Sequence, residues 1–272
     1  MKKLLKKILL IRRIYDGYNA SKYFNKKYFQ IFKWIFISKE DTNYTYDLTD
    51  KNQLEILSII QVITNKEITL LKKYLDELNN DNELKRFISN KIENSKFKNV
   101  TDKKIQFSRR IGWYILVRAI KPKVVVETGV DKGLGSLVLS SALLRNIDEG
   151  FPGEYIGTDI NPEAGYLFDG KYTKAGKIIY GDSIDSLKKL NKKIDLFIND
   201  SDHSAEYEAQ EYKTISSKLT EGAILLGDNS HVTDKLLKFS INNNRHFLLF
   251  KEEPKNHWYS GAGIGISFSK EK

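Results

Sequence analysis

Residues 124–144, which read VVVETGVDKGLGSLVLSSALL, decide how this chain folds. The valines at 124–126 form a β-branched run typical of a buried parallel strand. Gly129, Gly133 and Gly135 follow in a turn where the backbone can approach a ligand closely, because glycine has no Cβ atom. Residues 136–144 favour a helix. A strand, a glycine turn and a helix in this order open a nucleotide-binding α/β domain, with the ligand at the carboxyl end of the strand.

The order of acids and glycines in this turn distinguishes between ligands. Dinucleotide-binding turns read G-x-G-x-x-G, which brings a pyrophosphate to the helix N-terminus. Here the order is E-x-G-x-x-x-G-x-G, with Glu127 before the first glycine and Asp131 inside the loop. Two carboxylates would repel a pyrophosphate but suit a ligand with a cationic amine and a sulfonium. The stretch resembles motif I of the class I S-adenosylmethionine-dependent methyltransferases, which implies S-adenosylmethionine as the cofactor, bound near Glu127, Gly129, Gly133 and Gly135.

Composition excludes several other classes of protein. The 272 residues suffice for one large domain or for a core domain with an extension, and 40% of them are hydrophobic. No apolar run reaches the roughly 18 residues of a spanning helix. The chain has no cysteine, which excludes disulfides, thiolate metal sites and a cysteine nucleophile. This absence is in keeping with a cytoplasmic protein.

The net charge of +10 is concentrated at the N-terminus, because residues 1–40 hold eleven Lys or Arg and only two acids. The remainder is close to neutral, so nucleic-acid binding by the whole protein is not favoured. Residues 1–14 alternate basic pairs with Leu and Ile, and residues 23–37 are dense in aromatics. This segment could lie on the inner membrane surface, pack on the body of the protein, cover the active site as a lid, or contribute to a homo-oligomer. These alternatives stay open on the sequence alone.

The rest of the chain predicts an α/β protein with a helical N-terminal extension. Residues 41–50 look like a linker, residues 54–78 and 83–97 like helices, and residues 161–164 like the start of a short helix. We therefore expect an extension over 1–100 and a methyltransferase domain over 101–272, which begins with a helix at 102–119. Further strands are expected at 154–159, 177–180, 194–198, 223–226, 245–250 and 264–268. Together they predict a Rossmann-like, seven-stranded, mostly parallel sheet with its last strand antiparallel at or near the edge.

Polar residues at two strand ends are candidates for cofactor binding. Asp159 ends the second strand, where an acid can accept hydrogen bonds from ribose hydroxyls or cap the next helix. Gly181, Asp182 and Ser183 follow the third strand, and either Asp182 or Ser183 could cap the helix beyond it. In the class I methyltransferases an acidic or polar residue at this place contacts the adenine amino group. The resemblance implies the same role here.

Two more strand ends carry a second set of acids. Asp200, Asp202 and His203 follow the fourth strand, and Asp228 with Asn229 follows the fifth. We expect both strands beside the first one. Oxygen-rich side chains of this kind suit Mg²⁺ or another divalent cation, although Asp, Asn and Ser also cap helices. The pattern resembles the metal-dependent catechol and caffeoyl-CoA O-methyltransferases, which implies Asp200, Asp228 and Asn229 as metal ligands.

The longer run FINDSDHSAEY, residues 197–207, is similar to the macrocin O-methyltransferase-like group, which acts on sugars. The resemblance spans residues 105–268. The catechol enzymes have a lysine where this chain has His203, and an imidazole titrates near neutral pH, so we interpret His203 as the general base. Its simpler role would be as a neighbour of a helix cap. Arg109 and Arg110 lie upstream of the cofactor loop and could reach a carboxylate, but such arginines are more often surface residues, so they are not included in the site.

The sequence thus predicts an S-adenosylmethionine-dependent O-methyltransferase that acts on a hydroxyl of a sugar or another polyhydroxylated small molecule, assisted by a metal ion. Adenine and glutamine N-methyltransferases carry an N-P-P-Y-type motif after the fourth strand, which is absent here. Two alternatives stay open. One is a nicotinamide-dependent oxidoreductase, and the other is a non-catalytic cofactor-binding protein that docks to a membrane or a partner.

Overall fold

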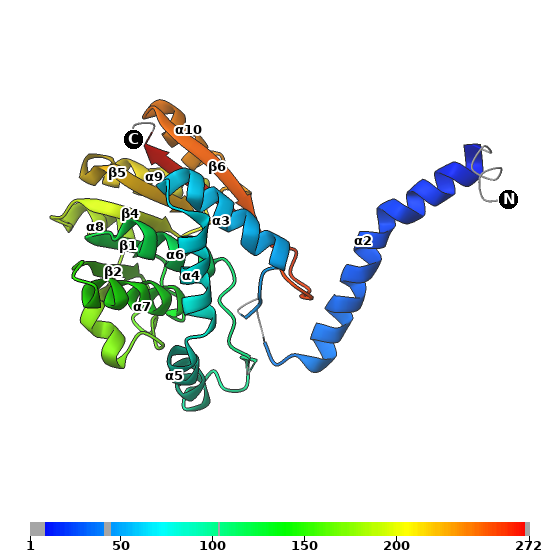
Figure 1. Ribbon diagram of the computed structural model, residues 1–272, viewed down its shortest axis with the longest axis horizontal. Coiled ribbons are helices and arrows are strands. Elements are labelled where there is room, and N and C mark those ends of the chain that lie inside the picture. Colours follow the sequence, from blue (N-terminus) through cyan, green and yellow to red (C-terminus); the bar gives the residue numbers. More distant parts are fainter. Residues whose placement is uncertain (1–8, 41–44, 103, 270–272) are drawn as a thin grey trace.

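The computed structural model describes residues 9–40, 45–102 and 104–269, and it contains one seven-stranded sheet (Figure 1). The strand order is β3-β2-β1-β4-β5-β7-β6. All neighbours pair in parallel except β7, which is antiparallel to both β5 and β6. The strands are β1 (Val124–Thr128), β2 (Glu154–Asp159), β3 (Gly176–Tyr180), β4 (Ile194–Asn199), β5 (Leu219–Gly227), β6 (Arg245–Lys251) and β7 (Gly263–Ser269). The predicted mostly parallel sheet, with its last strand antiparallel near the edge, is confirmed. β5 adjoins β4, however, and not β1 as expected.

Alternate residues of β1 belong to two different hydrophobic cores, because successive side chains of a strand point to opposite faces. Val125 packs in a core with α3 (Asp50–Thr64), α4 (Ile68–Asn79), α5 (Asn82–Glu93), α6 (Arg110–Ile120) and α7 (Leu134–Asp148). Val124 and Val126 face α8 (Ser183–Lys189), α9 (Ala205–Ile215) and α10 (Lys235–Asn242). Helices therefore cover both faces of the sheet, as a buried, β-branched strand requires.

Several helix boundaries differ from the sequence-based expectation. The helix expected over 54–78 is two helices, because Asn65 adopts a left-handed conformation (φ 52°) and ends α3. The helix expected from residue 102 begins only at Arg110. Residues 161–164 form a turn and not a helix. Short 3-10 helices cover Gly170–Ala175 and Ser216–Lys218.

The segment before α3 is packed into the body, although its polar composition suggested a linker. Residues 41–44 lie outside the described residues, but Tyr46 and Leu48 are buried, and Leu48 forms an isolated bridge with Pro254. Residues between 46 and 92 contribute to the same core as the sheet. A domain boundary near residue 100 therefore stays a prediction.

The basic N-terminal segment forms one long helix, α2 (Leu9–Ile37), and residues 1–8 lie outside the described part. In Figure 1 this helix extends away from the sheet. Within the described ranges, no helix is both long enough and apolar enough to cross a membrane.

The turn after β1 is pressed against the ends of two neighbouring strands. The backbone N–H of Gly129 donates to the carbonyl of Thr158 on β2 over 2.9 Å, and that of Asp200 donates to the carbonyl of Thr128 over 2.9 Å. Gly129 has φ 81°, and a Cβ atom there would overlap the backbone carbonyl of Asp200. Only glycine fits this position without a shift of the backbone.

We predict that Gly129→Ala lowers the free energy of unfolding by at least about 3 kcal/mol, because it adds a backbone clash to a left-handed φ. Gly150→Ala is the matched control. Gly150 has φ 87° but open space around its Cα, so its cost should be about 1 kcal/mol. Urea denaturation of both variants measures the difference. Equal costs would show that the close approach to Asp200 does not matter.

Candidate functional site

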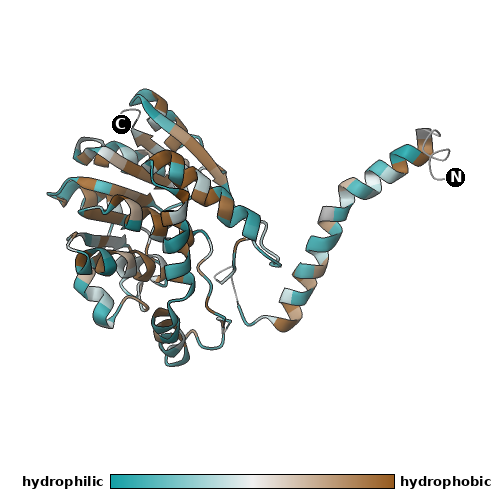
Figure 2. Ribbon diagram, viewed as in Figure 1, coloured by the Kyte–Doolittle hydropathy of each residue, from teal (hydrophilic) through white to brown (hydrophobic). Residues whose placement is uncertain are grey.

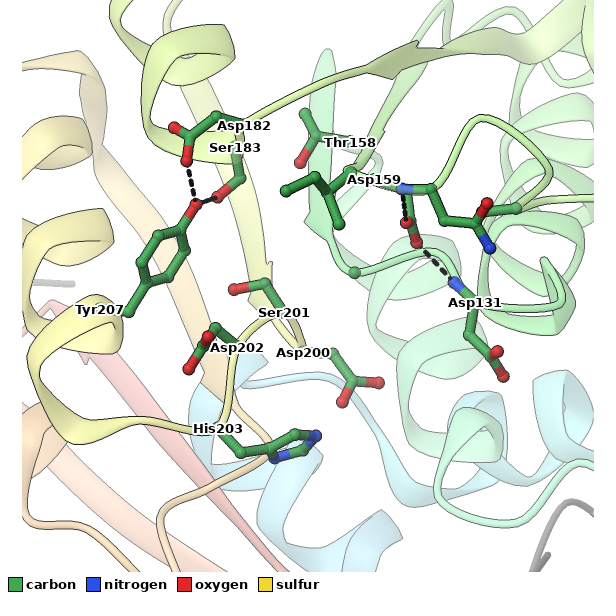
Figure 3. A pocket seen from close by; sticks show the side chains of 14 residues that line it. Asp131, Thr158, Asp159, Asp182, Ser183, Asp200, Ser201, Asp202, His203 and Tyr207 are labelled. Atoms are coloured by element: carbon green, nitrogen blue, oxygen red, sulfur yellow. Dashed lines mark hydrogen bonds between the residues drawn. The ribbon is translucent and has the colours of Figure 1, made fainter.

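Two cavities open at the carboxyl ends of the parallel strands. The first, of about 500 Å³, lies between the glycine turn, the ends of β2, β3 and β4, and the start of α9 (Figure 3). The second, of about 560 Å³, lies over the ends of β4 and β5. Both are lined by Gly129, Asp131, Asp200 and His203. A molecule in one cavity would therefore meet a molecule in the other at the end of β4.

Asp159 lines the first cavity and holds the glycine turn in place. One carboxylate oxygen accepts the backbone N–H groups of Val130 and Asp131, each over 2.9 Å, and the other accepts that of Asn161 over 2.8 Å. This acid therefore organises two loops from the tip of β2. It caps the turn at 161–164, where a helix was expected.

Asp182 and Ser183 line the opposite wall of the first cavity (Figure 3). Asp182 is the N-cap of α8 and accepts the backbone N–H of Asp185, which is the main reason that its pKa is lowered. The hydroxyl of Tyr207 lies 2.9 Å from both Asp182 and Ser183. Tyr207, on α9, was not predicted as a site residue. The only available signal was its position four residues after His203, one helical turn further on.

Glu211 joins the walls of the first cavity, and sequence analysis missed it too. Its buried carboxylate accepts hydrogen bonds from Thr128 over 3.0 Å, from Ser201 over 2.9 Å, and from Ser183 and Asn199. Burial raises its pKa. The residue lies one turn beyond Tyr207, but nothing in its local sequence shows that three separate strand ends converge on it.

Glu127 is buried behind the glycine turn and borders the second cavity. Its carboxylate accepts hydrogen bonds from the hydroxyls of Tyr155 and, over 3.1 Å, Ser136. Burial raises its pKa to about 7. Gly135 makes room for this carboxylate, because a Cβ atom there would overlap it.

The predicted glycines are brought together only in part. Gly129 lines both cavities, whereas Gly133, Gly135 and Gly181 line neither of them. Gly133 starts α7 with φ 89° and packs against the loop at Gly165. Contact between the four glycines and a cofactor therefore stays a prediction. What the structure shows is that Gly129 and Gly133 shape the turn after β1.

The acids at the ends of β4 and β5 contact Arg109, which was taken as a surface residue but is largely buried. Its Nη2 lies 3.0 Å from Asp200 Oδ2 and its Nε lies 2.8 Å from Asp228 Oδ1. Burial, followed by the neighbouring Asp228 carboxylate, raises the pKa of Asp200. No local signal identified Arg109, which stands 91 residues before Asp200 in the chain.

His203 is held by Asn229 across the end of the sheet. Its Nδ1 forms a hydrogen bond with the amide oxygen of Asn229. Because that oxygen can only accept, Nδ1 carries a proton, and Nε2 is the ring nitrogen that is left to exchange a proton with a ligand. The predicted acid Asp202 is exposed and accepts the N–H of Ser204 over 2.6 Å. His231 lines the second cavity, whereas His257 lines neither.

The three predicted metal ligands lie close together but do not form a ready ion site. Asp200 and Asp228 contact a guanidinium, and the amide oxygen of Asn229 is used by His203. Among the described residues, no group of three or more His, Cys, Asp or Glu side chains is arranged to hold a metal ion. As placed, these residues do not fit a divalent cation, and a metal requirement stays a prediction.

A family model of known proteins matches the part of the chain that runs from β1 to just after β5. Residues 126–230 match the family model described as a methyltransferase domain. No curated protein sequence matches the chain.

Two solved structures share the fold. One is from Klebsiella pneumoniae and has been suggested to be an O-methyltransferase; it has 12% identity and a TM-score of 0.53, over 70% of this chain and 91% of that one. The other is the O-methyltransferase TomG from Streptomyces achromogenes, involved in tomaymycin synthesis and solved with SAM; it has 10% identity and a TM-score of 0.50, with the same coverage. At such identities the likeness establishes the fold alone.

The raised pKa of Glu127 predicts a pH-dependent stability. The folded state holds this proton up to about pH 7, whereas an unfolded glutamate releases it near 4.3. The free energy of unfolding should therefore fall by about 3 kcal/mol as the pH rises from 4.5 to 7, because the unfolded chain releases this proton and the folded protein retains it. Glu127→Gln removes this cost, so its advantage over the wild type should grow through that window and then level off. Parallel curves in urea denaturation would contradict the assignment.

Proposed function

We propose that this chain, which is a class I S-adenosylmethionine-dependent methyltransferase, methylates a hydroxyl oxygen of a sugar or another small polyhydroxylated molecule. The observation that carries the proposal is the pair of cavities that meet at Asp200 and His203. The first cavity suits the methyl donor and the second suits the acceptor. The imidazole of His203 stands where they join.

The first cavity has the side chains that a nucleoside needs. Asp159 and Asp182 offer carboxylate oxygens for hydroxyl or amino groups, and Tyr207 adds an aromatic wall. Gly129 allows the backbone of the turn to approach a ligand closely. We propose that these residues, with Ser183, hold S-adenosylmethionine. When bound, this cofactor supplies a methyl group that is activated by attachment to a positively charged sulfur.

The second cavity is lined by cationic, anionic and imidazole side chains, among them Arg110, Lys132 and Asp228. Hydroxyl groups both donate and accept hydrogen bonds, so a polyhydroxylated acceptor matches such a mixed lining. Two buried atoms of the lining, Arg110 Nε and Asn229 Nδ2, have no hydrogen-bond partner among the described residues, whereas the carboxylate of Asp228 is paired with Arg109. Buried polar atoms without partners are rare in proteins, and a ligand or water normally satisfies them.

His203 is proposed as the general base. Asn229 fixes its ring through Nδ1, which leaves Nε2 as the nitrogen that can accept a proton. Nε2 takes the proton of the acceptor hydroxyl while the oxygen becomes the nucleophile. The cavity walls supply orientation and exclude water. No step is assigned to a metal ion, because the predicted ligands are already engaged.

We predict that His203→Ala lowers methyl transfer to sugars by about 100-fold or more while binding of S-adenosylhomocysteine is unchanged. Transfer from labelled S-adenosylmethionine to hydroxylated sugars and to amines measures the activity, and calorimetry measures the binding. His246→Ala is the control, because His246 lies on the exposed side of β6 and should leave both unaffected.

Four results would contradict the proposal. Full activity of the His203 variant would exclude the base. Transfer to amines alone would exclude O-methylation. Binding of NAD⁺ in place of S-adenosylhomocysteine would favour the oxidoreductase, and cofactor binding without turnover on any acceptor would favour the non-catalytic alternative.

We also propose that α2 lies on an anionic membrane surface. It carries six basic side chains and one acid. Tyr28, Phe32 and Phe36 recur every four residues and are each more than 60% exposed. Figure 2 shows hydrophilic and hydrophobic residues interspersed along the whole helix. Lys27 donates to the carbonyls of His257 and Tyr259, each over 3.0 Å, so the helix contacts the loop that borders the second cavity. Homo-oligomer formation stays a prediction.

We predict that the full chain binds vesicles containing phosphatidylserine and that added salt weakens this binding. Replacement of Lys22, Lys26 and Lys33 by Glu should lower partitioning at least about 100-fold, since each basic side chain near the surface contributes about 1 kcal/mol. The control makes the same charge change at Lys174, Lys189 and Lys213, which are exposed on the body. Equal losses in both variants would point to net charge and not to α2.

A further inference from the structure

Two acids from different strand ends share one cation, the guanidinium of Arg109. Its Nη2 contacts Asp200 beyond β4 at 3.0 Å, and its Nε contacts Asp228 beyond β5 at 2.8 Å. The three side chains are 11%, 14% and 9% exposed, respectively. The guanidinium therefore lies between the acids and borders the second cavity together with them.

The charges of this cluster are already balanced without an added ion. A buried carboxylate is costly unless a positive group compensates it. Arg109 contacts both acids, and the charge of Arg110 also acts on Asp200. A divalent cation would have to displace a guanidinium whose side chain is only 11% exposed and which contacts both acids.

The remaining oxygen donor of the cluster is also engaged. The amide oxygen of Asn229 accepts from His203, so an ion that took this oxygen would release the ring that we propose as the base. Arg109 also lies over an aromatic ring, because its Cζ is 5.8 Å from the ring centre of Trp113 on α6. This cation–π contact adds to the two carboxylate contacts that hold the side chain in place.

We propose that Arg109 is a built-in cation that fills the place of a divalent ion between Asp200 and Asp228 and positions both carboxylates at the second cavity. In the wild type this place does not bind metal. This proposal also implies that catalysis needs no metal ion, and that implication rests on the proposed methyl transfer. The prediction about ion binding is independent of the proposed methyl transfer.

Titration with Mn²⁺, followed by electron paramagnetic resonance, tests the proposal on the full chain. We expect no stoichiometric binding by the wild type. Arg109→Ala leaves the two carboxylates without their guanidinium partner, so this variant should bind one Mn²⁺ at least tenfold more tightly than the wild type does. Arg109→Lys retains a positive charge and should resemble the wild type. The double variant with Asp200→Asn should lose the gained site, which maps the ion to this pair of acids.

Two outcomes would overturn the proposal. Binding of one Mn²⁺ by the wild type, abolished by Asp200→Asn, would show that the ion and Arg109 coexist. Absence of binding by a folded Arg109→Ala variant would show that the guanidinium fills no ion site. Circular dichroism reports the folding of each variant, and if Arg109→Ala does not fold, Arg109→Gln takes its place, because it removes the charge but keeps a polar side chain. The expected gain of Mn²⁺ binding is the same.

Methyl transfer provides a separate measurement. The wild type should keep its activity in EDTA, whereas Arg109→Ala should lose at least tenfold and regain part of that loss on addition of Mn²⁺. Inactivation of the wild type by EDTA, reversed by Mn²⁺, would overturn the metal-free reaction. A wild type that is inactive on every acceptor would contradict the proposed function only, because the Mn²⁺ titration remains informative.

Discussion

The close contact between the turn after β1 and the end of β4 controls the geometry of the whole site. Gly129 and the backbone of Asp200 approach so closely that no side chain fits between them. This contact brings the glycine turn to the residues that follow β4, and both cavities are bounded by it. A wider separation would merge the two cavities or leave their contents too far apart to react, since reaction requires atoms about 3–3.5 Å apart.

The site is built largely from acids, and each buried one has partners that make burial tolerable. Glu127 accepts from two hydroxyls, Glu211 accepts from four side chains, and Asp200 contacts Arg109. Without these partners, burial of a polar or charged group would cost several kcal/mol. The resulting network makes the walls rigid, which is what a site that orients two small molecules requires.

The N-terminal helix and the acceptor-side cavity are physically connected. Lys27 of α2 bonds to the loop that contains Tyr259, and Trp34 packs against Trp258 of the same loop with ring centres 4.6 Å apart. Tyr259 in turn lines the second cavity. A surface on which α2 lies would therefore be close to a loop that lines that cavity.

The sequence by itself determined the strand, the glycine turn and the polar residues at the strand ends, because these are local patterns of hydrophobicity and turn chemistry. It also located Asp159, Asp182, Asp200 and His203 at one edge of the sheet, since parallel strands present their carboxyl ends together. Only the tertiary structure decided what these groups touch. Arg109 reaches Asp200 from 91 residues away, and Asn229 orients His203 from 26 residues away. Such contacts depend on how helices pack on the sheet, and no spacing along the chain encodes them.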